Sequence, residues 1–429
     1  MFLLAWLQEY LYERPDPNVI GVTLKYYYYK GVAWMIGVLV VSLLTWFFVQ
    51  RYRRSRVLRR QPRRTDDRLL KRVAKIKDDL SRRYLRPGFS NTIHAVGIGQ
   101  LSGSNEYCIQ VFVSDATREL ALGSGTRRLL PRYRGIPLVL IEMPMASFLS
   151  ATPSSPVEWK KFAQGIREHQ DVIIGGISGA NTNLTGQSGT IGYFCTRKSK
   201  LPRRKEIHLL SNSHVFADLQ KTNIDEGDLI MQPSPGEPAN ARPIASLVNF
   251  SPLKFGGDIK EPNHVDAAIA KLWVTQQHKP LIPLIGAITG YVPKKEIRIG
   301  EPVRKFGRTT GYTEGSIFSI ELDIRIRYDR TGQSAFFQNQ FLIEPTLPKF
   351  MKFVAKGDSG SLVVDAEQHA IGLIFGGMAE LPGSLKGAQN VEPNTVVNPV
   401  PPDLKRIESY GVANPISEVL DRLKIDLVV

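Results

Sequence analysis

Three short segments of this 429-residue chain carry residue types that together could perform nucleophilic catalysis. His214 follows HLLSNS (208–213), Asp266 precedes the small apolar run AAIA (267–270), and Ser359 lies within KGDSGSLVV (356–364). A serine hydroxyl needs a base to accept its proton as it attacks, and histidine has a pKa close to working pH. A buried carboxylate can orient that histidine. The sequence therefore predicts a catalytic triad of His214, Asp266 and Ser359.

The glycines beside Ser359 allow backbone N–H groups to turn toward a developing oxyanion, and we expect Gly357 and Ser359 to supply them. Two nearby residues compete for triad roles: Ser361 as nucleophile and Asp258 as orienting carboxylate. We favour Ser359 because glycines flank it. We favour Asp266 because the apolar run after it is typical of a buried strand, which would remove the carboxylate from water.

The order and local sequences of these segments resemble those of trypsin-like serine proteases of the chymotrypsin fold, of the bacterial and plant type. The order His, Asp, Ser differs from that of subtilisins and of α/β-hydrolases. The likeness covers 171–429 and includes SNSHV, DAAIA, GDSG and the preceding VRKFGRTTG (303–311). It implies a mainly β, two-barrel protease domain with a C-terminal helix. It also implies cleavage of polypeptides through an acyl-enzyme.

The same resemblance implies a substrate pocket and an activation device. Phe353 falls where trypsins carry the acidic residue that binds Lys or Arg, and Gly376 and Gly377 would line the same pocket. The segment starting at Ile173 resembles the new N-terminus of an activated trypsin, for which Asp358 would be the partner. No basic cleavage site precedes Ile173, so we expect the active site to form or to be gated without such cleavage.

The segment before these motifs predicts one transmembrane helix at 31–50. Nineteen residues, 31–49, carry no charge, and as a helix they would span about 28 Å of bilayer. Eight arginines follow between Arg51 and Arg64 and supply half of the net charge of +16. The positive-inside rule then places the rest of the chain in the cytoplasm. Lying against the bilayer, these arginines favour anionic lipid headgroups as partners, and no nucleic acid is expected.

The remaining chain divides by composition and periodicity. Apolar residues at helical spacing predict a helix over 67–84, and alternating segments predict strands at 94–100, 107–113 and 137–143. The expected parts are an N-terminal tail that could lie in the membrane interface (1–30), the transmembrane helix (31–50), a basic juxtamembrane segment (51–66), a small α/β domain (67–150), a linker (151–170) and the protease domain (171–429).

The sequence also limits the chemistry. Cys108 and Cys195 are too few for a disulfide framework, and no Cys or His spacing typical of a metal site occurs, so no cofactor or metal is expected. We expect a membrane-anchored, cytoplasm-facing serine endopeptidase. The α/β domain would bind a regulatory protein or gate the site, and the long loop 381–402 could block it. Two alternatives stay open: an envelope protease facing the periplasm, and a catalytically silent scaffold.

Overall fold

The computed structural model describes residues 67–86, 92–114 except 102, 132–148, 165–379 with short gaps, and 409–429. The gaps within 165–379 are 166, 185, 199–205, 220–222, 226, 238–239, 257–258, 329–332 and 348. The predicted tail, transmembrane helix and basic segment, most of the linker, Asp258 and the loop 381–402 therefore lie outside the described residues. Within the described ranges, no helix combines the length and the apolar character needed to cross a bilayer.

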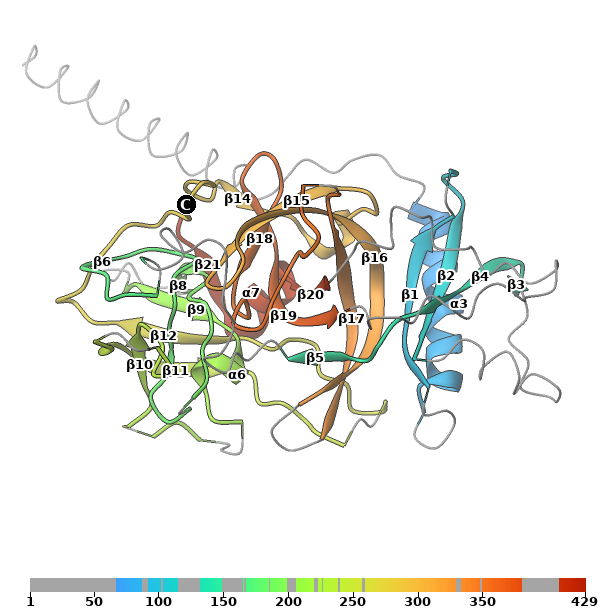
Figure 1. Cartoon of the computed structure of the whole chain (residues 1–429). Coiled ribbons are helices and arrows are strands. Elements are labelled where there is room, and N and C mark those ends of the chain that lie inside the picture. The colour runs from blue at the N-terminus through green and yellow to red at the C-terminus, as the bar shows by residue number, and fades with distance from the viewer. Residues whose placement is uncertain are drawn as a thin grey trace, which may run out of the picture. The chain divides into compact units, whose positions relative to one another are not determined.

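The chain is mainly β, and its larger sheet contains a closed barrel (Figure 1). Six strands follow one another in the order β15, β18, β19, β20, β17 and β16, and β16 also pairs with β15, which closes the ring. Their bounds are β15 (Pro302–Gly307), β16 (Gly311–Arg327), β17 (Ser334–Pro345), β18 (Leu362–Val364), β19 (His369–Ala379) and β20 (Ser409–Pro415). The short strands β14 (Gly290–Tyr291) and β5 (Ala146–Phe148) pair with this sheet from outside the ring order.

The N-terminal described region extends the same sheet. Strand β1 pairs antiparallel with β16, and the order continues through β2, β4 and β3 (Figure 1). These elements are α3 (Asp67–Tyr84), β1 (Ile93–Gln100), β2 (Tyr107–Val113), β3 (Arg132–Tyr133) and β4 (Ile136–Glu142). Helix α3 buries Val73 and Leu80 in a core that it shares with β1, β2 and the barrel. The region 67–142 is therefore joined to the barrel through backbone hydrogen bonds and through a common core.

A second sheet of seven strands follows the order β21, β8, β9, β12, β11, β10 and β7. Its strands are β7 (Ala180–Asn181), β8 (Tyr193–Arg197), β9 (His208–Ser211), β10 (Leu229–Gln232), β11 (Arg242–Phe250), β12 (Ala268–Leu272) and β21 (Ile425–Leu427). A two-stranded sheet joins β6 (Val172–Ile173) to β13 (Gln277–His278). The helices of this half are α6 (Ser213–Phe216), the 3-10 helix η2 (Lys294–Glu296) and α7 (Ile416–Leu423).

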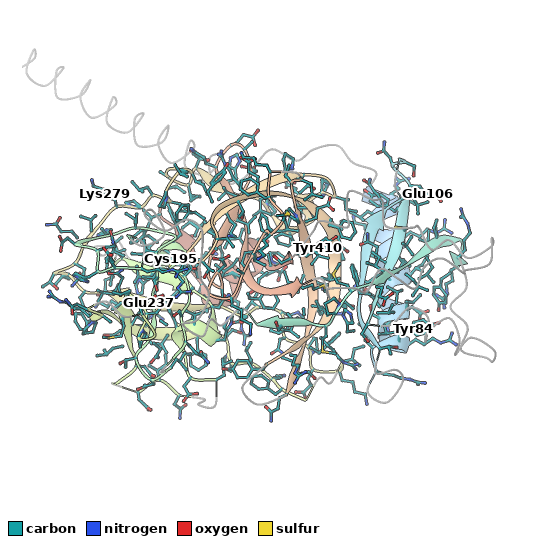
Figure 2. All side chains as sticks on the ribbon, viewed as in Figure 1. Tyr84, Glu106, Cys195, Glu237, Lys279 and Tyr410 are labelled. Atoms are coloured by element: carbon teal, nitrogen blue, oxygen red, sulfur yellow. The ribbon has the colours of Figure 1, made fainter. Side chains whose placement is uncertain are left out.

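Helix α7 begins directly after β20 and packs its apolar face into the core of the seven-stranded sheet. Pro415 stands at its N-cap, where a missing N–H costs no intrahelical hydrogen bond. Both cysteines are buried and free, and burial raises the pKa of the Cys108 thiol to about 12. Cys195 lies in the core of the seven-stranded sheet (Figure 2). Neither cysteine adjoins the residues predicted to carry chemistry.

Candidate active site

The position of His214 is fixed by the short helix α6 at the end of β9. The preceding residue, Ser213, donates its hydroxyl to the carbonyls of Ser251 and Ala267, each at 2.8 Å. Phe216 is fully buried on the other side of this single turn. The sequence SNSHVF thus supplies a polar anchor before the histidine and an apolar anchor after it, and the imidazole is held between them.

Asp266 and His214 form a close pair. The Nδ1 atom of His214 lies 2.5 Å from Oδ2 of Asp266, and the backbone N–H of His214 donates to Oδ1 at 3.2 Å. Both side chains are 0% exposed. A carboxylate at Nδ1 holds the proton there and makes Nε2 the basic nitrogen of the ring. The two residues predicted to form the acid–base pair are therefore brought together in the geometry that this role requires.

Two asparagines that sequence reasoning did not single out hold the backbone of Asp266. The amide of Asn212 donates to the carbonyl of Asp266 at 2.7 Å, and the carbonyl oxygen of Asn414 accepts the N–H of Asp266 at 2.9 Å. Both asparagines are fully buried. The motifs SNSH and ANPI contain them, and for Asn414 a polar residue within an otherwise apolar segment was the available signal.

Ser359 lies in a turn that only glycines allow. Gly357 and Gly360 have φ values of +101° and +95°, a region that other residues rarely adopt. A Cβ atom on Gly360 would also collide with the carbonyl of Thr190 and the hydroxyl of Ser211. The hydroxyl of Ser359 lies 3.4 Å from the carbonyl of Phe375. The turn therefore presents Ser359 beside strand β19.

The backbone N–H groups of this turn separate into two sets. Those of Asp358, Gly360 and Ser361 donate to carbonyls within the protein, at 2.8–3.0 Å. Those of Gly357 and Ser359 donate to no atom of the described residues. Two unengaged donors beside the serine match the expected oxyanion site. The hydroxyl of Ser361 donates to the carbonyl of Asp358 at 2.6 Å, so it is engaged inside the turn.

Thr190 connects the nucleophile turn to the strand that leads to His214. Its N–H donates to the carbonyl of Ser359 at 2.8 Å, and its hydroxyl donates to the carbonyl of Gly357 at 2.9 Å. Its own carbonyl accepts the hydroxyl of Ser211, three residues before His214, at 2.8 Å. Thr190 thus links Ser359, on the barrel side, to His214, on the seven-stranded sheet.

The carboxylate of Asp358 pairs with a lysine of the uncleaved chain, Lys305. Oδ2 lies 3.3 Å from Nζ of Lys305, and both side chains are 0% exposed. The carboxylate also accepts hydrogen bonds from the backbone of Ala355, Thr309 and Thr310. Burial lowers the pKa of Lys305, and the carboxylate opposes that shift.

Ile173 lies elsewhere, within β6. Its carbonyl accepts the N–H of Lys279 at 2.9 Å, and its side chain is buried. The partner that the sequence suggested for Asp358 is therefore replaced, in the uncleaved chain, by Lys305.

The residues expected to line the substrate pocket occupy two different settings. Phe353 is fully buried in the barrel core, where Cβ atoms on Gly315 or Gly411 would touch its ring. Gly376 and Gly377 lie on β19 and pair with β20 on one side. On the other side they pair antiparallel with β5, Gly376 opposite Phe148 and Gly377 opposite Ser147.

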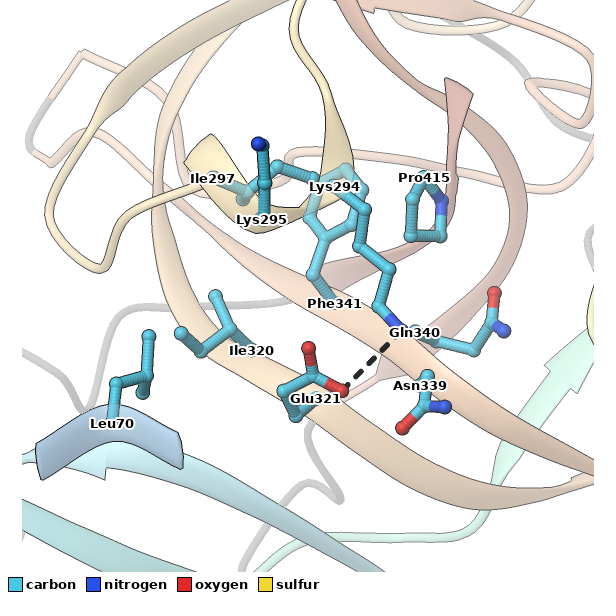
Figure 3. A pocket seen from close by; sticks show the side chains of 10 residues that line it. All are labelled: Leu70, Lys294, Lys295, Ile297, Ile320, Glu321, Asn339, Gln340, Phe341 and Pro415. Atoms are coloured by element: carbon cyan, nitrogen blue, oxygen red, sulfur yellow. Dashed lines mark ion pairs between the residues drawn. The ribbon is translucent and has the colours of Figure 1, made fainter. Parts of the chain in front are cut away.

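A small cavity in the described residues lies away from the triad, between α3 and the barrel (Figure 3). Its volume of about 30 Å³ is enough for about two waters. Leu70 of α3 and Gln340 of β17 are among the side chains that line it. It is too small for a peptide, so we do not assign it to substrate.

Three residues of the hairpin between β18 and β19 carry grouped metal-type ligand atoms: Asp365, Glu367 and His369. The carboxylate of Asp365 is already engaged, because it accepts the N–H groups of Glu367 and His369 at 3.0 and 2.7 Å. Its second oxygen lies 3.0 Å from Nδ1 of His369. These contacts account for the group as a turn-stabilising set of hydrogen bonds.

Comparison with known proteins gives weak likenesses. No protein-family model matches the chain, and no curated protein matches it. Among solved structures, the chain is similar to Nocardiopsis protease (14% identity, 60% of this chain and 99% of that chain, TM-score 0.36). It is also similar to Thermobifida fusca Protease A (16% identity, 60% and 99%, TM-score 0.35) and to the Rv3671c protease from M. tuberculosis (14% identity, 67% and 91%, TM-score 0.26). With TM-scores and identities this low, these likenesses establish neither a family nor an activity for this chain.

Proposed function

We propose that this protein is a serine endopeptidase that acts through His214, Asp266 and Ser359. The observation that carries the proposal is the buried contact of 2.5 Å between His214 and Asp266, with Thr190 hydrogen-bonded both to the turn of Ser359 and to Ser211, three residues before His214. The order of these residues and the chymotrypsin-like division between two β units support the same conclusion.

In this mechanism Ser359 Oγ attacks the scissile carbonyl while His214 Nε2 accepts its proton. The Asp266 carboxylate stabilises the imidazolium that forms. The oxyanion receives hydrogen bonds from the N–H groups of Gly357 and Ser359, each worth about 3 kcal/mol of the barrier. His214 then protonates the leaving amine, and water hydrolyses the acyl-enzyme by the reverse sequence of proton transfers.

The proposal includes restraint of this activity by the chain itself. An extended peptide binds to a sheet edge by adding a strand, and the edge at Gly376 and Gly377 lies next to Phe375, whose carbonyl is 3.4 Å from Ser359 Oγ. Strand β5, from the region before the protease domain, already pairs with that edge. All three triad side chains are 0% exposed. We infer that the chain is held in a resting form, which β5 must leave before a substrate strand can pair.

The cellular setting is proposed from the sequence. A transmembrane helix at 31–50 would anchor the enzyme, with the arginines between Arg51 and Arg64 against anionic headgroups and the catalytic region in the cytoplasm. A regulatory protein would bind the region 67–150. Protease protection in sealed inside-out vesicles tests the orientation: digestion of the catalytic region supports it, and survival supports the periplasm-facing alternative.

Labelling with a fluorophosphonate probe tests the chemistry. We expect Ser359→Ala to abolish labelling and Ser361→Ala to retain most of it, because the hydroxyl of Ser361 is engaged with its own turn. Ser147→Pro removes a backbone donor from β5 and should increase the labelling rate of the otherwise unchanged chain. Equal loss in the two serine variants would refute the assignment of the nucleophile. No labelling of either wild type or Ser147→Pro would favour a silent scaffold.

A further inference from the structure

Two buried amide side chains form a chain of hydrogen bonds that starts at the backbone of the proposed catalytic aspartate. Asn414 accepts the N–H of Asp266 and donates its own amide to Oε1 of Gln340 at 2.6 Å. Gln340 in turn donates to the carbonyl of His264 at 2.9 Å. Asn414 and Gln340 are 0% and 1% exposed. The two amides therefore fix both ends of the segment 264–266, and both belong to the barrel sheet rather than to the sheet that carries Asp266.

The backbone at Gln340 is itself held in an unusual conformation. Its neighbour Asn339 has a φ of +62°, and Glu321 on the paired strand has a φ of +48°. The register of β16 against β17 is irregular here, between Ser319 and Leu322 and again between Leu322 and Ile324. Such backbone persists only where surrounding contacts determine it. The N–H of Asn339 donates to Oδ1 of Asp323 at 3.0 Å, so this carboxylate contacts the backbone where the register is irregular.

Asp323 depends on a cation from the N-terminal helix. Its Oδ2 lies 3.0 Å from Nζ of Lys77 on α3, and the two side chains are 1% and 0% exposed. Asp78 also contacts the ammonium, at 2.8 Å, but is 41% exposed. Burial opposes the charge on Lys77, whereas the carboxylates of Asp323 and Asp78 raise its pKa above the ordinary value. Without Lys77, Asp323 would be a buried carboxylate with no cation, which is strongly unfavourable.

We propose that Lys77 is a positioning residue for the catalytic carboxylate, acting through Asp323, the Asn339–Gln340 backbone and Asn414. The inference rests on the proposed serine-protease function. It gives the region 67–142 a defined part in that function. Helix α3 supplies the charge that keeps Asp323 in place, and Asp323 positions the Asn339–Gln340 backbone. Gln340 and Asn414, which we call the amide clamp, then hold the segment 264–266. A protein that binds this region would change the activity by moving Lys77.

The packing around these residues allows such movement. The cavity of about 30 Å³ borders Asn339 and Gln340, and Lys294 and Glu321 form an ion pair of 3.5 Å beside it (Figure 3). A core without such space would resist a shift of the Asn339–Gln340 backbone. Here the cavity leaves space beside Asn339 and Gln340 that close packing would fill.

The test uses the full-length protein and four variants. Lys77→Met removes the cation at similar volume, and Lys75→Met, at an exposed position of the same helix, is its matched control. Lys77→Met/Asp323→Asn removes both charges and keeps an acceptor for Asn339. Gln340→Met removes the hydrogen bonds of Gln340 to Asn414 and to the carbonyl of His264 without leaving a buried charge. If Lys77→Met does not fold, Gln340→Met still tests whether these hydrogen bonds position Asp266.

Two readouts are compared. The first is the fluorophosphonate labelling rate together with peptide turnover at increasing substrate concentration. We expect Lys77→Met and Gln340→Met to lower the labelling rate and kcat about tenfold, with KM little changed. The double variant should recover most of the loss, and Lys75→Met should match wild type.

The second readout is the far-downfield NMR signal of the His214 Nδ1 proton, assigned by its loss in Asp266→Asn, which needs no turnover. It should shift in Lys77→Met and Gln340→Met and return in the double variant. Folded Lys77→Met or Gln340→Met proteins with the wild-type signal would overturn the proposal. Failure of both wild type and Ser147→Pro to label, with the NMR shifts as expected, would refute the protease function and leave the positioning role standing.

Discussion

Replacement of Lys305 by methionine tests whether a buried ion pair holds the nucleophile turn. Lys305 and Asp358 lie 3.3 Å apart with both side chains 0% exposed. Methionine has a similar length and no charge, so the packing next to Phe353 is largely kept. The substitution removes the cation of a carboxylate that stands one residue before Ser359, together with the hydrogen bonds of the ammonium to the Thr310 hydroxyl and the Gly311 carbonyl.

The expected cost follows from the geometry. Two unit charges 3.3 Å apart attract by about 5 kcal/mol at an effective dielectric constant of about 20. Removal of one partner of a buried pair typically costs about 3–5 kcal/mol. Asp358 keeps hydrogen bonds from the backbone of Ala355, Thr309 and Thr310, which continue to favour its ionised form. We therefore expect Lys305→Met to lower the free energy of unfolding by an amount in the lower half of that range.

Equilibrium urea unfolding of the full chain in detergent provides the measurement. Without its cation, the buried carboxylate of Asp358 keeps only its hydrogen bonds, so the free energy of unfolding at neutral pH should fall by the amount given above. Fluorophosphonate labelling of the same samples should slow in parallel.

Lys271→Met is the matched control. Lys271 pairs with Glu206 at 2.6 Å, but the two side chains are 44% and 57% exposed, so its removal should cost less than about 1 kcal/mol. If Lys305→Met lowered the free energy of unfolding by no more than this control, the ion pair would not be what holds the turn. A new N-terminus at Ile173, formed by cleavage, would then again be a candidate partner for Asp358.

Three further variants test the acid–base chemistry and the N-terminal region. Asp266→Asn should keep the fold but lower turnover by about ten-thousand-fold, because the His214 ring would then adopt the wrong tautomer. Asp258→Asn should have a small effect. Labelling rates of the two variants provide the measurement, and a larger effect of Asp258→Asn would make Asp258 the orienting carboxylate. Burial lowers the pKa of His94 to about 4 from 6.5, against the opposing effect of its contact with the Met143 carbonyl. The neutral ring therefore stabilises the fold fully above pH 6.5, and about 3 kcal/mol is lost as pH falls to 4. His94→Gln, which does not titrate, should lose correspondingly less over this interval in urea unfolding; an identical acid dependence in both proteins would exclude His94 as its source.

The residues proposed to carry the chemistry could be picked out from the sequence because each lies in a short segment whose local pattern is informative. Glycines on both sides of Ser359 predicted a turn, and the structure has positive φ values at Gly357 and Gly360. The apolar run after Asp266 predicted a buried strand, and β12 starts two residues after it. Local sequence determines local backbone in these places, so no knowledge of distant contacts was needed.

The supporting residues could not be found in this way. Lys77 and Lys305 read as surface lysines, since lysine is rarely buried without a partner, and their partners Asp323 and Asp358 are distant in the sequence. The pairing of β1 with β16 joins segments more than 200 residues apart, which periodicity does not encode. Phe353 illustrates a related gap: a resemblance gave its position in the chain, whereas only the tertiary packing showed its ring inside the barrel core.

The geometry of the candidate site is a property of the contact between its two sheets. His214 follows β9 and Asp266 precedes β12, both strands of the seven-stranded sheet, whereas Ser359 precedes β18 of the barrel. No single sheet therefore positions all three side chains. Thr190 makes the connection on the nucleophile side through the carbonyls of Gly357 and Ser359.

Asn414 and Gln340 make the connection on the aspartate side. Both connections consist of buried hydrogen bonds, whose loss leaves polar groups unsatisfied, so they break at a cost of about 1–3 kcal/mol each. A few such bonds are enough to hold the candidate triad residues in one arrangement. They are also weak enough for that arrangement to be altered by a change of charge at Lys77 or by a strand that leaves the edge at Gly377.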